Sequence, residues 1–274
     1  MNESRLGRRA FLGASAAGLA SLAFVEKSFA AAGYTGYQLG SQSYSFRNFS
    51  FPDSIAQLKG LGLANLEFCS VHFNPDAADP GFATVQSTIA ASGIKVLCYG
   101  VEEFTKDDAA NRKKFEFAKA LGIGVLTANP DAESFSSLDA LCEEFKIKIA
   151  IHNHGPKARY DKVTDTLKAV EGHHPFIGAC VDTGHVIRSG EKPHEVIAAL
   201  GPRVHSLHLK DWVFNGKEQI LGKGDMDLAA VATSLKALGF TGPLMVEYEE
   251  SPDNPVPDMK IGLENWTAAC KAAK

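Results

Sequence analysis

Short apolar runs alternate with longer amphipathic stretches from residue 38 to the end of the chain, and this alternation limits the fold to a few architectures. The strand-like runs are residues 38–46, 64–70, 94–100, 124–128, 147–153, 177–182, 204–209 and 243–248. The helix-like stretches are 52–61, 80–92, 107–121, 134–146, 161–171, 193–200, 227–238 and 257–272. Eight strand–helix units in about 240 residues predict an α/β fold, a closed (β/α)₈ TIM barrel of one domain. An open doubly wound sheet is the alternative.

The first 32 residues have the pattern of an export signal. Arg8-Arg9 precede Phe11-Leu12 and an apolar run that ends near Val25, as in a twin-arginine signal, although Gly7 stands where Ser or Thr is usual. That run is too short to span a bilayer well, so cleavage is favoured over a retained N-terminal anchor. We therefore predict a periplasmic barrel formed by residues 33–274, without stable membrane insertion once the signal is removed.

Charge and cysteine content exclude two classes of protein. The net charge is −4 and is spread evenly, so no basic groove for nucleic acid is predicted. The five cysteines form no CxxC pair, and three of them fall in apolar strand-like runs, which argues against a disulfide framework.

Ionisable side chains end several of the predicted strands. In a (β/α)₈ barrel these ends share one mouth, where active sites lie. The residues concerned are His152, His154, Asp182, His185, His208 and Glu247. Imidazole and carboxylate together suit Mn²⁺, Zn²⁺, Co²⁺ or Fe²⁺ better than Mg²⁺ alone. Burying so many ionisable groups near one another without a cation is costly, so the cluster predicts a divalent metal site.

Each of these residues also has a plainer structural interpretation. A histidine in a strand is often a hydrogen-bonded core residue, and Asp182 could cap the next helix. Glu247 could be a buried carboxylate paired with Lys210. The grouping on consecutive strands favours the metal site over these separate roles.

Several motifs resemble the xylose-isomerase-like barrel superfamily, which includes ketose 3-epimerases, inosose dehydratases, hydroxypyruvate isomerases and an abasic-site endonuclease branch. The motifs are DTGH (182–185), HLKD (208–211), GKGD (222–225) and VEYE (246–249), and GSQSYSFR (40–47) resembles exported sugar isomerase/epimerase-like members. The resemblance covers essentially the whole mature chain. It implies metal ligands from strands five to eight, which fall by position on His152, Asp182, His208 and Glu247.

One departure from the family pattern affects the predicted chemistry. Most sugar-active relatives have Glu at the strand-five position, where this chain has His152. Ketose epimerases use two metal-bound glutamates as bases, and a metal-bound imidazole is a poor replacement base. One-base isomerisation or elimination therefore fits better than two-base epimerisation. Whether His152 or His154 is the strand-five ligand stays open.

The endonuclease branch is disfavoured by missing ligands. Its trinuclear zinc site needs further histidines, and the corresponding positions here are in Cys98-Tyr99-Gly100, Ala128-Asn129-Pro130 and Asp225-Met226-Asp227. We expect no nucleic-acid partner.

The sequence thus predicts a metal-dependent isomerase or epimerase-type enzyme that converts a small sugar, keto-sugar or cyclitol through an enediolate. Glu247 is the expected base, with His185, Lys210 and His154 as further catalytic candidates. Other polar or stacking candidates at the mouth are Glu67, Glu103, Tyr44, Phe46, Phe68 and Trp212. The alternatives are a lyase or dehydratase, a 3-keto-glycoside-cleaving enzyme with the same metal site, and a non-catalytic exported carbohydrate-binding barrel. The choice among Mn²⁺, Co²⁺, Zn²⁺ and Mg²⁺, and a homo-oligomeric state, are left open.

Overall fold

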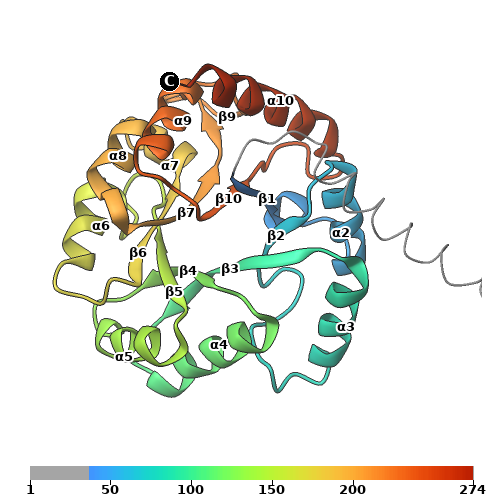
Figure 1. The fold of residues 1–274 in the computed structure, drawn as a ribbon, viewed down its shortest axis with the longest axis vertical. Helices are drawn as coiled ribbons and strands as arrows, with labels where there is room; N and C mark the ends of the chain where they lie inside the picture. The colour runs from blue at the N-terminus through green and yellow to red at the C-terminus, as the bar shows by residue number, and fades with distance from the viewer. Residues whose placement is uncertain (1–36, 274) are drawn as a thin grey trace, which may run out of the picture. The chain divides into compact units, whose positions relative to one another are not determined.

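The computed structural model describes residues 37–273, and these residues form a closed barrel of eight parallel strands (Figure 1). The order around the barrel is β1-β10-β7-β6-β5-β4-β3-β2, so each strand lies beside its neighbours in the chain. The bounds are β1 Gln38–Gln42, β2 Asn65–Phe68, β3 Lys95–Phe104, β4 Val125–Pro130, β5 Lys148–His152, β6 Ile177–Asp182, β7 Val204–Leu209 and β10 Pro243–Val246. This confirms the predicted (β/α)₈ architecture. The predicted export signal, residues 1–32, lies outside the described residues.

Helices follow the strands and surround the barrel (Figure 1). Their bounds are α2 Phe51–Gly60, α3 Phe82–Ser92, α4 Asp108–Leu121, α5 Phe135–Phe145, α6 Val163–Val170, α7 Thr183–Arg188, α8 Pro193–Leu200, α9 Leu228–Ala237 and α10 Val256–Ala272. Side-chain caps begin several of them: Asp107 accepts a hydrogen bond from the Ala110 N–H, and Asp227 accepts one from the Ala230 N–H. In the described part of the chain, no helix is long and apolar enough to cross a membrane.

The structure differs from the predicted elements mainly in the loops at the carboxyl ends of the strands. The run 38–46 stops as a strand at Gln42 and continues as a 3-10 helix, η1 (Ser43–Phe46). The short helix α7 directly follows β6, and a small antiparallel ribbon, β8 (Asp211–Trp212) with β9 (Glu218–Gln219), follows β7. Both additions lie at the mouth of the barrel, where they supply residues to the site.

Small and medium apolar side chains fill the barrel interior below that mouth. The interior cluster consists of Cys98, Val125, Ala150, Cys180 and Met245, all buried. The cysteines Cys69, Cys98, Cys142 and Cys180 are buried free thiols, which agrees with the expectation that they do not form a disulfide framework. The charged cluster therefore rests on an apolar floor that excludes water from below.

Candidate metal centre and active-site cavity

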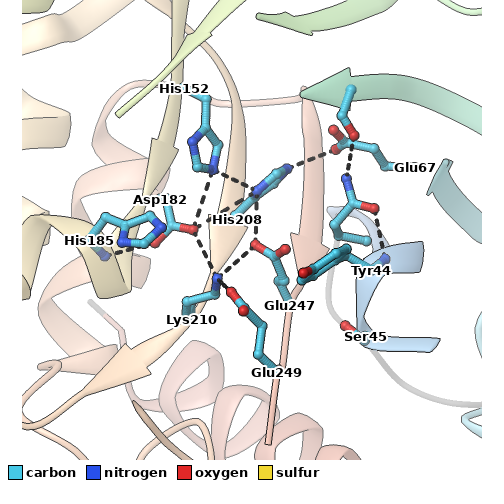
Figure 2. Close-up of polar contacts among 12 residues, drawn as sticks. Tyr44, Ser45, Glu67, His152, Asp182, His185, His208, Lys210, Glu247 and Glu249 are labelled. Carbon is cyan, nitrogen blue, oxygen red and sulfur yellow. Dashed lines mark hydrogen bonds and ion pairs between the residues drawn. The ribbon is translucent and has the colours of Figure 1, made fainter. Parts of the chain in front are cut away.

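Four buried side chains from consecutive strands converge at the mouth of the barrel (Figure 2). His152 ends β5, Asp182 ends β6, His208 lies in β7, and Glu247 directly follows β10. One potential ligand atom from each lies within 4.8 Å of the other three. The structure thus brings together all four residues to which the family resemblance assigned the metal.

The side-chain amide of Asn153, the residue after β5, holds the backbone of Asp182 in place. The Asn153 side chain accepts a hydrogen bond from the Asp182 N–H (2.9 Å) and donates one to the Asp182 carbonyl (3.1 Å), which prolongs the strand pairing. Carboxylate oxygen Oδ1 of Asp182 accepts from the His185 N–H at the start of α7 (2.8 Å), so the predicted capping role is also present. The other oxygen, Oδ2, is buried and has no hydrogen-bond partner in the described chain. A buried carboxylate oxygen left without a donor, and facing three other ligand atoms, fits a cation.

His208 is oriented by a carboxylate behind it. Its Nε2 lies 2.9 Å from Glu67 Oε2, and its Nδ1 lies 3.2 Å from Glu247 Oε2 and 3.1 Å from His152 Nε2 (Figure 2). With Nε2–H donated to Glu67, Nδ1 would offer its lone pair to a cation bound in the cluster, the arrangement typical of metal-binding histidines. Glu67 is fully buried, so it supports His208 from behind and does not line the cavity as a substrate contact.

The two candidate histidines of strand five occupy different positions. His152 Nε2 lies 3.4 Å from Asp182 Oδ2 and belongs to the four-ligand group. The His154 ring lies beside the His152 ring, with 4.5 Å between centroids, and lines the cavity. Burial, together with the neighbouring His152, lowers the pKa of His154 to about 4. The geometry favours His152 as the ligand and leaves His154 as a neutral cavity residue.

Lys210 is a buried cation within the same cluster. Its Nζ lies 3.1 Å from Glu247 Oε2 and 3.7 Å from Asp182 Oδ2, and it donates a short hydrogen bond to Glu249 (Figure 2). Burial alone would lower the pKa of Lys210, but these carboxylates outweigh it and raise the pKa above its usual value. Gly184 makes the approach possible, because a Cβ there would lie 2.6 Å from the Lys210 side chain. The predicted Glu247–Lys210 pair therefore exists alongside the metal-ligand geometry.

A cavity of about 600 Å³ opens above the cluster. Of the predicted site residues, those that line it are His152, His154, His185, Lys210, Glu247, Tyr44 and Trp212. Phe46 and Phe68 are fully buried, so they pack in the core, the commoner role for such aromatics, and do not line the cavity. Glu103 is exposed and hydrogen-bonds Asn129, so it is not part of the site.

The loop after β7 is organised by Asp211. Its carboxylate accepts hydrogen bonds from the backbone N–H groups of Gly222 (2.8 Å), Gly224 (2.9 Å) and Met226 (3.1 Å). The two glycine N–H groups of the GKGD segment thus point at Asp211, a side chain of the protein itself. Glu218, on the preceding strand β9, lines the cavity.

Several residues that line the cavity were not among the predicted site residues, and they include the charged side chains of Arg47, Arg188 and Glu218. Glu218 is buried on β9, and burial raises the pKa of its carboxyl to about 8. The dipeptide Asn215-Gly216, between β8 and β9, is a common hairpin signal and could have indicated the ribbon.

Replacing Glu67 with Gln is expected to weaken metal binding about 10- to 100-fold, because the ring of His208 would lose its charged acceptor. The affinity can be measured by competition with a chromophoric chelator. Glu103→Gln, which removes an exposed carboxylate, is the matched control and should bind metal like the wild type. Equal affinity in Glu67→Gln and the wild type would contradict the proposed support of His208.

The fold agrees with comparison to known proteins. A model of the xylose isomerase-like TIM barrel family matches residues 28–270. The chain belongs to this family. Inosose dehydratase of Clostridium botulinum is 24% identical over 256 residues, which cover 83% of this chain and 82% of that protein. The rhizopine catabolism protein MocC of Rhizobium meliloti is 28% identical over 151 residues, 47% of this chain, and the match spans less than half of its length (46%).

A solved L-ribulose 3-epimerase shares the fold. It superimposes with a TM-score of 0.67 at 15% identity over 85% of this chain and 94% of that one. The chain is thus similar in sequence to an inosose dehydratase and in fold to an L-ribulose 3-epimerase, and it carries a His/Asp/Glu cluster that could hold a metal.

Proposed function

We propose that this protein is a metal-dependent enzyme that removes the proton next to the carbonyl of a small keto-sugar, sugar or keto-cyclitol. The observation that carries the proposal is the four-ligand cluster with one carboxylate, Glu247, open to the cavity. A bound divalent cation would polarise the substrate carbonyl and offset the negative charge that develops on it. We further propose that the enzyme works in the periplasm, on the basis of the export-signal pattern of residues 1–32.

Glu247 is the proposed base. Its Oε2 is directed at His208 and Lys210, while Oε1 has no hydrogen-bond partner in the described chain. Burial alone would raise the pKa of Glu247, but Lys210 and His208 outweigh it and lower the pKa, so the carboxylate is ionised at neutral pH. Oε1 can therefore take the substrate proton. His152 stands where a second glutamate would be needed for two-base epimerisation, so one-base chemistry is favoured.

The fate of the enediolate distinguishes two reactions. Return of the proton from Glu247 to the former carbonyl carbon, with a hydroxyl proton passing from one of the two enediolate oxygens to the other, gives isomerisation between an aldose and a ketose. Loss of a hydroxyl from the next carbon gives elimination, and the leaving oxygen then needs a proton. Glu218 favours this second candidate, because a carboxyl with a pKa raised to about 8 retains its proton at neutral pH and lines the same cavity. The similarity to inosose dehydratase also supports elimination.

A substrate panel in D₂O separates these possibilities. Ketoses, inososes and 3-keto-glycosides would each be incubated with the protein and Mn²⁺, Co²⁺, Mg²⁺ or Zn²⁺. We expect NMR to detect deuterium at the carbon next to the carbonyl of one substrate class, with or without a dehydrated product. If elimination occurs, Glu218→Gln should retain deuterium exchange and lose most of the dehydration. Binding of a panel member without exchange or product would instead favour the non-catalytic carbohydrate-binding barrel.

A further inference from the structure

Arg188, the last residue of α7, lies in a slot formed by the loops after β5, β6 and β7. Its guanidinium carbon lies 4.7 Å from the centroid of the Trp212 ring. Gly155 leaves room for the guanidinium, because a Cβ at that position would lie 2.9 Å from Cζ. Nitrogen NH1 lies 2.8 Å from Nδ1 of His185, one turn earlier on the same helix. The guanidinium is thus held in contact with an imidazole that lines the cavity.

The chemistry of this contact determines which ring nitrogen of His185 carries the hydrogen. A guanidinium only donates hydrogen bonds and keeps its charge at any ordinary pH. Nδ1 of His185 must therefore accept, and the hydrogen of the neutral ring lies on Nε2. Nε2 has no hydrogen-bond partner within residues 37–273, and it is not among the buried atoms that lack one. It is therefore available to a molecule in the cavity.

We propose that Arg188 is a positioning residue that holds His185 as a fixed Nε2–H donor to the substrate oxygen on which charge develops. The identity of that oxygen, the carbonyl beside the proton taken by Glu247, rests on the proposed function. The tautomer of His185 does not depend on the proposed function. With its lone pair committed to Arg188, His185 stabilises the oxyanion and does not act as a base. This role assigns separate tasks to the two residues, with Glu247 as proton acceptor and His185 as hydrogen-bond donor.

Three variants test the contact in different ways. Arg188→Met removes the donor and keeps much of the apolar bulk beside Trp212. Arg188→Lys keeps a positive charge but loses the planar guanidinium group. Gly155→Ala leaves Arg188 unchanged and displaces its guanidinium through the close approach at Cζ. A purely structural role for Arg188 would affect thermal stability in these variants without changing the His185 tautomer.

The decisive readout is the tautomer of His185 in ¹⁵N-histidine-labelled protein loaded with Zn²⁺, with signals assigned by comparison with His185→Gln. We expect an unprotonated Nδ1 and a protonated Nε2 in the wild type, and a mixture of tautomers in Arg188→Met and Gly155→Ala. A protonated Nδ1 in the wild type, or an unchanged pattern in Arg188→Met, would overturn the proposal. This measurement needs no substrate, so its failure is distinguishable from failure of the proposed reaction.

Kinetics provide a second readout once a substrate is found. Loss of one oriented donor to a developing oxyanion is expected to lower kcat about 10²-fold, with a smaller change in KM. Added guanidinium ion should restore part of the activity of Arg188→Met, and the same concentration should not activate Glu247→Gln. Equal loss in kcat for His185→Gln and the double variant with Arg188→Met would confirm that the two residues act together. Additive losses would contradict it.

Discussion

Replacement of Glu247 with Gln, or of Asp182 with Asn, is expected to remove the bound metal and to lower kcat by about 10³-fold or more. Both substitutions keep the shape of the side chain and remove a negative charge from the four-ligand cluster. Asn can still accept the hydrogen bond from the His185 N–H, so the start of α7 should persist in Asp182→Asn. The Glu247 variant loses the proposed base as well as a ligand.

Metal content per chain, measured by mass spectrometry of the purified proteins, separates loss of metal from loss of the base. Glu249→Gln is the matched control, because Glu249 also contacts Lys210 but is not one of the four converging ligands. We expect it to retain the metal. Wild-type metal content and activity in Asp182→Asn would contradict the assignment of the ligands.

Lys210→Met is expected to destabilise the metal-free protein by about 3 kcal/mol or more, because it removes the buried ammonium that pairs with both Asp182 and Glu247. Both carboxylates are directed at the Lys210 ammonium, and the lysine is only 1% exposed. A divalent cation supplies the missing positive charge, so added metal should recover much of the loss. Chemical unfolding with and without Mn²⁺ gives both values.

An exposed ion pair provides the control for this experiment. Lys192 lies 2.9 Å from Glu195 with both side chains largely exposed, so Lys192→Met should change stability little and show no added metal dependence. A Lys210→Met protein as stable as the wild type without metal would show that Lys210 does not hold the cluster together.

The barrel could be predicted because its signal is repeated along the chain. Each strand-like run and each amphipathic stretch is short, yet together they specify one topology, and the eight barrel strands coincide closely with the runs. The elements that were missed lack such repetition. Helix α7 has only six residues, and the β8–β9 ribbon pairs two residues with two. Their conformations depend on contacts such as those of the Asp211 carboxylate with the following loop.

The ligands could be located because the carboxyl ends of parallel strands meet at one mouth. Roles that depend on how deeply a side chain is buried, or on its tertiary contacts, could not be predicted from the sequence. Glu67 follows an ordinary strand pattern, and only the closed barrel shows that it lies behind His208 and not in the cavity. Arg188 resembles a surface residue at a helix end, and its contact with His185 requires α7 to form and Gly155 to leave space. The choice between His152 and His154 likewise needed the contact of His152 with Asp182 and its place in the four-ligand group.

A crystal structure of the protein grown with Mn²⁺, with diffraction recorded at the manganese absorption edge, tests the metal centre directly. We expect one anomalous peak at the mouth of the barrel, bound by Nε2 of His152, Nδ1 of His208 and the carboxylates of Asp182 and Glu247, at about 2.0–2.3 Å. A structure with no peak there, and with the Lys210 ammonium still occupying the space among the carboxylates at saturating metal, would contradict the proposed metal centre.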